Sequence, residues 1–95
     1  MITSTVDVVI EIINRAGIAT GIPHSRIYSA TKQTRIVRTR WAIMRTLRIR
    51  HCWTLTEIGE HFGMDHSNIA HGLNRAAELV GKDKWFAALC KALAA

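Results

Sequence analysis

The feature that most constrains the fold is a pair of helix-capping signals within residues 54–75, TLTEIGEHFGMDHSNIAHGLNR. Thr54 and Glu57 have the spacing of a capping box, in which each side chain satisfies a free backbone N–H at the start of a helix. Gly63 falls where this helix must end, because glycine tolerates a positive φ, and Asp65 can cap a following helix. The stretch therefore predicts two short helices joined by a tight turn, a helix-turn-helix.

The second predicted helix has one apolar and one polar face. At 100° per residue, the apolar side chains on one side are Ile69, Leu73, Ala76, Ala77 and Val80. The polar side chains opposite them are Asn68, His71 and Arg75, flanked by Ser67, Asn74 and Glu78. An asparagine can pair with adenine, an arginine with guanine, and serine or histidine can reach a base or a phosphate. Any surface helix has a polar face, but the capped turn and a nearby basic segment favour a recognition helix for the major groove.

Basic residues are concentrated in the first half of the chain. The 95 residues carry a net charge of +6, and no Asp or Glu occurs from Ile12 to Thr56. The cations in this stretch are Arg15, Arg26, Lys32, Arg35, Arg38, Arg40, Arg45, Arg48 and Arg50. Such a concentration of one sign favours a polyanionic partner. RNA competes with DNA at this point, because charge alone does not distinguish the two.

A long basic helix is predicted over residues 34–50. Its buried side chains are expected to be Ile36, Ile43, Met44 and Leu47. Arg38, Arg45 and Arg48 fall within about 80° of one another, with Trp41 among them. A solvated charged face is the ordinary alternative. Because unpaired charges of one sign repel each other, the pattern favours a set of phosphate contacts.

An N-terminal helix is predicted over residues 6–15, with Ser4 or Thr5 as its cap. Its apolar side chains are Val6, Val9, Ile10 and Ile13. Its polar side chains are Asp7, Glu11 and Asn14. A loop is expected over residues 17–23, followed by a short helical turn that Ile27 anchors in the core.

The C-terminal segment is predicted to close the core, with a dimer seam as the alternative. Asp83 can cap a last helix that runs to Ala94. The apolar residues of this helix are Trp85, Phe86, Leu89 and Leu93. Trp53 is expected to cover the helix-turn-helix from the core side. Together the elements predict one all-α domain over residues 1–95, with five to six helices and a central helix-turn-helix over about residues 54–80.

The run from Leu55 to Asn74, with its IGEHFGMDHSNIAHGL, resembles the signature of the C-terminal DNA-binding domain of the bacterial replication initiator DnaA. The segment VVIEIINRAGIATGIPHSRIYS resembles the opening of that domain, and the stretch from Lys32 to Arg50 resembles its basic helix. The resemblance covers roughly residues 5–92. It implies a Trp-repressor-like arrangement of helices and sequence-specific binding of double-stranded DNA at short origin boxes.

The resemblance and the charge pattern together assign roles to individual residues. The residues expected to contact bases are Lys32, Asp65, His66, Ser67, Asn68 and His71. The residues expected to contact phosphates are Arg35, Arg38, Arg40, Trp41, Arg45, Arg48, Thr54 and Arg75. In the family, a loop before the long helix puts an arginine into the minor groove, and Lys32 takes that position here. Asn68 stands where a threonine is common, which favours an adenine at that point of the site.

Other classes of function receive little support. Cys52 and Cys90 lack the paired spacing of a zinc site and are typical of a reducing cytoplasm. His61, His66 and His71 are five residues apart, which scatters them around a helix instead of converging them on a metal ion. No metal, cofactor or catalytic pair is expected. The chain lacks both an apolar run of about 20 residues and a basic signal region, so a cytoplasmic, nucleoid-associated protein is predicted.

The expected function is control of DNA replication or transcription by a stand-alone protein that reads initiator-type boxes, with a phage or prophage gene as one source. A phosphate-binding GxxxxGK[ST] motif is absent from the sequence, so an ATPase or any other enzyme is not expected. Two alternatives remain open. One is a dimeric repressor that reads an inverted repeat, although a monomer on DNA is favoured. The other is an interaction module that acts on the host replication initiator.

Overall fold

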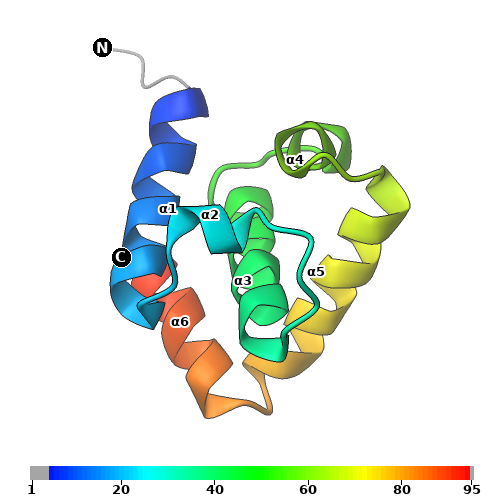
Figure 1. Ribbon diagram of the computed structural model, residues 1–95. Coiled ribbons are helices and arrows are strands. Elements are labelled where there is room, and N and C mark those ends of the chain that lie inside the picture. Colours follow the sequence, from blue (N-terminus) through cyan, green and yellow to red (C-terminus); the bar gives the residue numbers. More distant parts are fainter. Residues whose placement is uncertain (1–4, 95) are drawn as a thin grey trace.

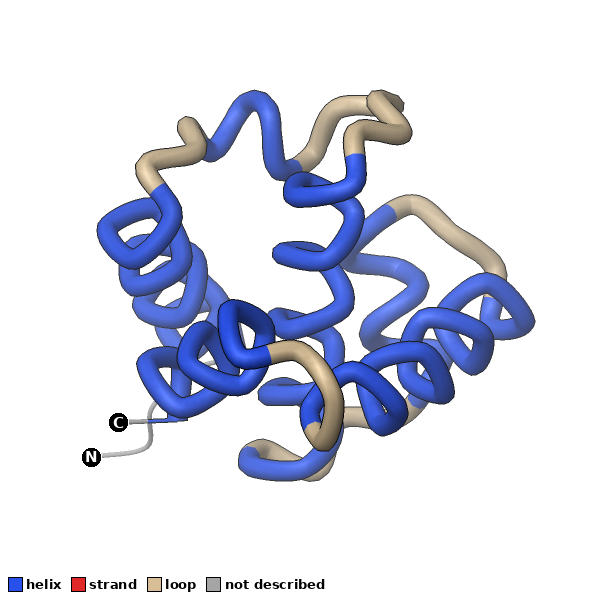
Figure 2. The backbone as a smooth tube through the Cα atoms, turned by 90° about the horizontal axis from the view of Figure 1, so that it is seen from below, coloured by secondary structure: helices blue, strands red, loops and turns tan. Residues whose placement is uncertain are grey.

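The computed structural model describes residues 5–94 and folds them into six α-helices (Figure 1). The helices are α1 (Thr5–Thr20), α2 (His24–Ile27), α3 (Thr34–Arg50), α4 (Leu55–Phe62), α5 (His66–Val80) and α6 (Lys84–Ala94). Only helices and loops occur among these residues, as Figure 2 shows from a second direction. The prediction of an all-α fold with five to six helices is confirmed.

The long helix α3 lies at the centre of the fold, and α1, α5 and α6 pack around it (Figure 1). All six helices contribute to one hydrophobic cluster. Its large, fully buried members include Ile12, Ile27, Ile43, Leu47, Ile58, Ile69, Phe86 and Leu93. Burial of one such side chain contributes about 1.5–3 kcal/mol. This packing, more than helix propensity, holds the short helices α2 and α4 in place.

The first helix is longer than predicted. Helix α1 continues to Thr20, so most of the loop expected over residues 17–23 is helical. The Thr20 hydroxyl donates a hydrogen bond to the carbonyl oxygen of Ala16 at 2.7 Å, and Gly21 ends the helix with a φ of +73°. A glycine inside a helix costs only about 1 kcal/mol, which the packing of α1 against α3 and α6 offsets, so Gly17 does not stop it.

The packed face of α1 also differs from the prediction. Ile10 belongs to the predicted apolar side of this helix, but 52% of its surface is exposed, and Ile12, outside that predicted side, is buried with 2% exposed. The buried residues of α1 are Val9, Ile12, Ile13 and Ala16. The face is rotated because α1 must contact both α3 and α6. Ser4 with its predicted cap, and the side chains of Thr5 and Val6, lie outside the described part of the structure.

The remaining elements follow the sequence-based expectations. Helix α3 has the predicted bounds, and its expected core residues are all buried: Ile36, Ile43, Met44 and Leu47. Ile27 is fully buried at the end of α2, and Trp53 is buried with 8% exposed. Asp83 caps α6, because its Oδ1 accepts the backbone N–H of Phe86 at 2.8 Å. Helix α6 thereby closes the core against α3 and α1.

Candidate nucleic-acid interface

The helix-turn-helix starts with the capping box that the sequence predicts. The Thr54 hydroxyl oxygen accepts the backbone N–H of Glu57 at 3.1 Å, and the Thr54 N–H donates to the Glu57 carboxylate at 2.9 Å. The bond from the Thr54 N–H holds the pKa of Glu57 below its usual value. Thr54 is also a predicted phosphate contact, but its N–H and its hydroxyl both interact with the Glu57 carboxylate in the cap.

Two glycines set the turn between α4 and α5. Gly63 ends α4 in the left-handed region, with a φ of +66°. At Gly59, an added Cβ would lie 2.5 Å from the backbone oxygen of Met64 and 3.7 Å from Cγ1 of Ile69. No side chain fits at this distance from a backbone atom, so residue 59 must be glycine for the two helices to approach this closely. The predicted role of Gly63 at the end of the first helix is confirmed.

Helix α5 presents one polar row and buries its opposite side. Asp65 caps the helix, because its Oδ1 accepts the backbone N–H of Asn68 at 3.1 Å, and this bond lowers the pKa of Asp65. The exposed polar residues are His66, Ser67, Asn68, His71, Asn74, Arg75 and the acidic Glu78. The buried residues are Ile69, Gly72, Ala76 and Leu79. Ala77 was predicted on the buried face but is exposed, because it lies just outside the sector that α3 covers.

The side chain of Trp41, a residue of α3, packs against α5. A Cβ added at Gly72 would lie 2.7 Å from Cδ1 of Trp41 and 3.1 Å from Sδ of Met44. Helix α5 therefore approaches α3 at a point where it has no side chain. The rings of Trp41 and His71 meet edge to face, with centroids 6.2 Å apart. Trp41 packs beneath the polar row, and the phosphate contact predicted for it remains a prediction.

Arg40 holds the loop that carries Lys32. Its side chain is 7% exposed, and Nε donates to the carbonyl oxygen of Ile27 at 2.7 Å. Nη2 donates to the carbonyl oxygens of Ser29 at 2.7 Å and Thr31 at 2.8 Å. Burial lowers the pKa of Arg40, but a guanidinium stays charged at neutral pH. These carbonyl oxygens have no donor within a helix, and Arg40 supplies one to each of them, while the phosphate contact predicted for Arg40 remains a prediction.

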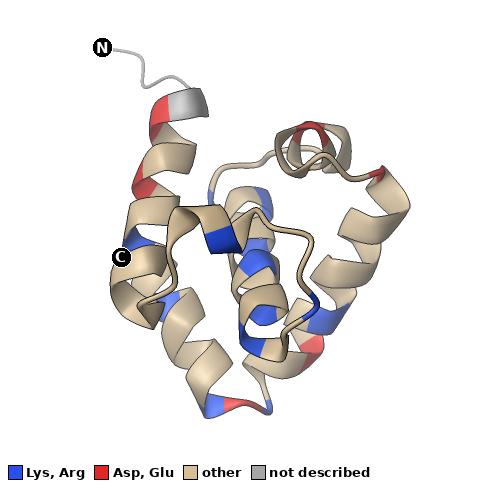
Figure 3. Cartoon of the chain, viewed as in Figure 1, with Lys and Arg blue, Asp and Glu red and all other residues tan. Residues whose placement is uncertain are grey.

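Lys32 and Arg35 are exposed on either side of the start of α3. Lys32 lies in the loop before the helix, and Arg35 lies in its first turn. The guanidinium carbon of Arg35 is 5.1 Å from the centroid of the Trp85 ring, a cation–π contact. Figure 3 shows the basic residues gathered on α3 and on the segment before it, while the acidic residues lie mainly on α1, on α4 and at the ends of α5.

Three further predicted phosphate residues already have partners within the protein. They are Arg38 with the Asp83 carboxylate at 2.7 Å, Arg48 with the Trp53 carbonyl oxygen at 2.9 Å, and Arg75 with the Glu78 carboxylate at 2.9 Å. Solvent-exposed ion pairs are typically worth about 1 kcal/mol or less. Of the three, only the pair of Arg75 and Glu78 is solvent-exposed, so a phosphate can compete for Arg75 without a large loss of stability. The Arg38 pair and the Arg48 bond are partly buried.

Arg45 is not brought together with the other cations of the candidate interface. It lies ten residues beyond Arg35 along α3, a rise of about 15 Å. Its half-buried side chain lines a cleft between α3 and α6 together with Arg50 and Lys91. The sequence suggested one basic stripe because helical angles alone do not show which neighbouring helix covers each part of α3.

Tyr28 and His61 form a contact that the sequence analysis does not predict. Tyr28 Oη and His61 Nε2 are 2.5 Å apart. Burial raises the pKa of Tyr28 to about 12 and lowers the pKa of His61, so both groups are neutral at pH 7 and share one hydrogen bond. The bond ties the residue after α2 to α4. No local pattern could have revealed it, because the two residues are 33 positions apart.

Other kinds of site find no support in the part of the chain that the structure describes. Residues 5–94 contain no group of three His, Cys, Asp or Glu side chains placed to hold a metal ion. Within the same residues, none of the helices has the length and apolar character needed to cross a membrane. Cys52 and Cys90 are free thiols.

A capped helix-turn-helix whose second helix exposes a polar row, next to a basic loop and helix, defines a helix-turn-helix DNA-binding domain. The chain belongs to the family described as the bacterial DnaA protein helix-turn-helix, which matches residues 7–76. The match covers more than half of the chain, from α1 into the second half of α5. Neither a curated protein nor a solved structure matches it. The resemblance to the C-terminal domain of DnaA is thereby confirmed, and the family binds DNA and is not catalytic.

Proposed function

We propose that this protein binds double-stranded DNA in a sequence-specific manner at initiator-type boxes, and so controls replication or transcription on the nucleoid without ATPase activity. In this proposal α5 enters the major groove and the Lys32 loop enters the adjacent minor groove. The observation that carries the proposal is the exposed row on α5, whose members can each bond a base edge or a phosphate. The membership of the chain in the DnaA helix-turn-helix family supports it.

The chemistry of the row fits base readout. The Asn68 amide can donate to and accept from one adenine, and His71 lies one turn further along the same face. Ser67 is next to Asn68 at the start of the helix, where free N–H groups and the helix dipole favour a phosphate. The contact between the rings of His71 and Trp41 restricts the histidine, which reduces the entropy lost on binding.

Phosphate contacts are assigned to cations that remain exposed or weakly paired. In this proposal they are Arg35, Arg38, Arg48 and Arg75, while Lys32 is assigned to the minor groove. Arg40 acts indirectly, since it fixes the loop on which Lys32 sits. A preformed loop loses less entropy on entering a groove than a mobile one does.

Fluorescence anisotropy with a labelled initiator-box duplex and a scrambled duplex of equal composition, over a salt series, tests the proposal. We expect tighter binding to the box that persists at moderate salt, because base contacts do not depend on counterion release. Equal affinity for both duplexes, falling together as salt rises, would mean that these sites are bound through phosphates alone. An unbiased selection of DNA sites would then show whether any sequence is preferred.

Matched variants separate base readout from the interaction-module alternative. We expect Asn68→Ala and His71→Ala each to lose about 1–3 kcal/mol of discrimination between box and scrambled DNA. Glu60→Gln, on the exposed side of α4, is the control and should change discrimination little. A protein that acts only by contacting the host initiator would tolerate all three substitutions.

A further inference from the structure

The outward side of α1 is apolar and acidic. Ile18 is 86% exposed and Ile10 is 52% exposed, and Asp7 and Glu11 lie on the same side of the helix. We call these four residues the α1 face. Two hollows of about 300 Å³ and about 500 Å³ lie along it; Ile10 lines the first, Ile18 lines the second, and His24 lines both. Neither hollow is lined by a Lys or an Arg.

A cleft with the opposite charge lies between α3 and α6. It has a volume of about 310 Å³, and its cations are Arg45, Arg50 and Lys91. No carboxylate lines it. Ile49, 56% exposed, stands in the same cleft beside the half-buried Cys90. We call these five residues the α3–α6 cleft.

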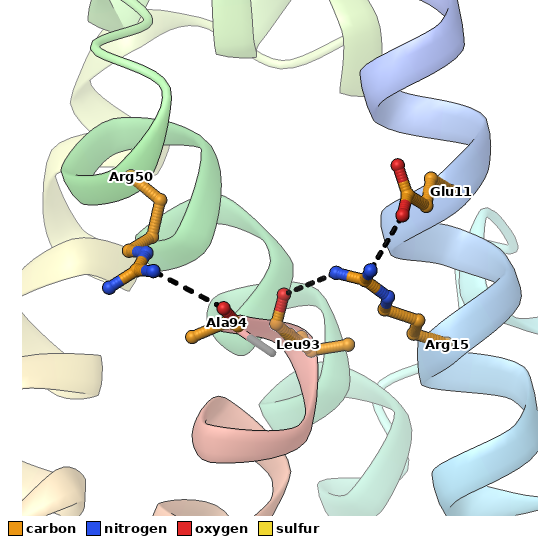
Figure 4. Close-up of polar contacts among 5 residues, drawn as sticks. All are labelled: Glu11, Arg15, Arg50, Leu93 and Ala94. Carbon is orange, nitrogen blue, oxygen red and sulfur yellow. Dashed lines mark hydrogen bonds and ion pairs between the residues drawn. The ribbon is translucent and has the colours of Figure 1, made fainter.

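The two surfaces lie on different sides of the end of α6. Figure 4 shows Arg50 and Glu11 on opposite sides of this end. Arg50 donates to the carbonyl oxygen of Ala94 at 3.3 Å, while Arg15 donates to the Glu11 carboxylate at 2.6 Å and to the carbonyl oxygen of Leu93 at 3.5 Å. The end of α6 separates the two surfaces, so they do not meet within one molecule.

We propose that the α1 face of one copy packs into the α3–α6 cleft of the next copy, with Ile18 entering the cleft and Glu11 facing Lys91. Charge complementarity selects a second copy as the occupant, because one chain carries both a cationic apolar cleft and an apolar face with two carboxylates, of which Glu11 also pairs with Arg15 at 2.6 Å. The two surfaces also hold three of the four large hydrophobic residues that are exposed among residues 5–94. Such clusters mark interaction sites more often than single exposed side chains do.

An interface between two different surfaces is head-to-tail, so it can join copies in a row. The net charge of +6 opposes association of the free protein, and DNA phosphates remove that repulsion. Assembly of such a row of copies along DNA rests on the proposed DNA binding. The contact itself needs only charge neutralisation, so a duplex of random sequence is sufficient to test it.

Cysteine cross-linking in a Cys52→Ser, Cys90→Ala background tests the pairing. One protein carries Ile18→Cys and a second carries Ile49→Cys, and a short bis-maleimide is added to each alone and to the mixture, with a random-sequence duplex present. We expect cross-linked dimers to be at least about fivefold more abundant in the mixture than with either protein alone. Cross-linking of Ile18→Cys with itself at the same level would overturn the proposal in favour of a symmetric α1–α1 contact. Equal, low cross-linking in all three samples would overturn it as well.

Charge reversal provides the second measurement. We expect Lys91→Glu or Glu11→Lys alone to reduce the mixed cross-link several-fold, and the two reversals together to restore it. Lys82→Glu is the matched control, because Lys82 is exposed in the turn after α5, outside both surfaces, and should leave the cross-link unchanged. An equal loss in Lys82→Glu, or no rescue in the double reversal, contradicts the pairing. Loss of box preference alone would count against the proposed function and not against this contact.

Discussion

At the scale of single residues, the structural role of Arg40 is the clearest. A buried charge is normally costly, but the Arg40 guanidinium meets three carbonyl oxygens at 2.7–2.8 Å. The same side chain therefore satisfies backbone groups that no helix satisfies and fixes the path of the chain toward Lys32. A lysine could not replace it, because an ammonium group lacks the planar fork that reaches several acceptors.

Substitution of Arg40 is expected to destabilise the fold. Arg40→Leu leaves buried carbonyl oxygens without a donor, so we expect the free energy of unfolding in urea to fall by about 2–3 kcal/mol. Arg35→Leu, which removes an exposed cation, should cost less than about 1 kcal/mol. If the two variants lose the same stability, Arg40 does not hold the loop as described.

The pair of Tyr28 and His61 predicts a pH dependence. Burial depresses the pKa of His61 in the folded protein, so below the unfolded pKa of about 6.5 the unfolded chain takes up the proton more readily. Stability is unaffected by this group above that pH and falls as the pH drops below it. We expect urea midpoints measured at pH 7.5 and pH 5.0 to fall more for the natural sequence than for His61→Gln, which does not titrate. An equal fall in both proteins would contradict this role.

At the scale of elements, the close approach of α4 and α5 depends on the absence of a side chain at Gly59. At Gly59 the obstacle to a Cβ is the backbone oxygen of Met64, which cannot rotate away as a side chain can. At Gly17, inside α1, a Cβ would find only ordinary contacts, the nearest at 3.5 Å. An alanine at Gly59 and an alanine at Gly17 are therefore expected to change the stability of the protein in opposite directions.

Alanine at these two positions forms a matched test. We expect Gly59→Ala to destabilise the protein by about 1–3 kcal/mol, because overpacking against a fixed backbone outweighs the better helix propensity of alanine. We expect Gly17→Ala to be neutral or to stabilise the protein by about 0.5–1 kcal/mol. Thermal unfolding followed by circular dichroism measures both, and similar shifts in the same direction would refute the packing argument.

At the scale of the whole molecule, the distribution of charge predicts how binding responds to salt. Lys32 is exposed in the loop before α3, whereas Lys82 lies in the turn between α5 and α6. We expect Lys32→Ala to make the slope of log affinity against log salt less negative by about one, the loss of one released counterion. Lys82→Ala should leave the slope unchanged. The reverse pattern would place the DNA on a different surface.

Much of the fold and part of the candidate site could be predicted from the sequence, because the deciding atoms lie within a few residues of each other. The bond from Glu57 to Thr54 and the bond from Asn68 to Asp65 each span three positions, so residue types alone identify them. The bounds of α3 follow from its apolar spacing. The end of α1 does not follow in this way, since packing against distant helices offsets the cost of Gly17.

The sequence by itself determined the caps, the turn, the polar row on α5 and the excess of positive charge. Only the tertiary structure decided which cations are free for a partner. It directs Arg40 to carbonyl oxygens 9–13 residues away and pairs Tyr28 with a residue 33 positions distant. It also places Arg45 in a separate cleft. The physical reason is that a cap depends on neighbours along the chain, whereas the partner of a long side chain depends on which segments the core brings together.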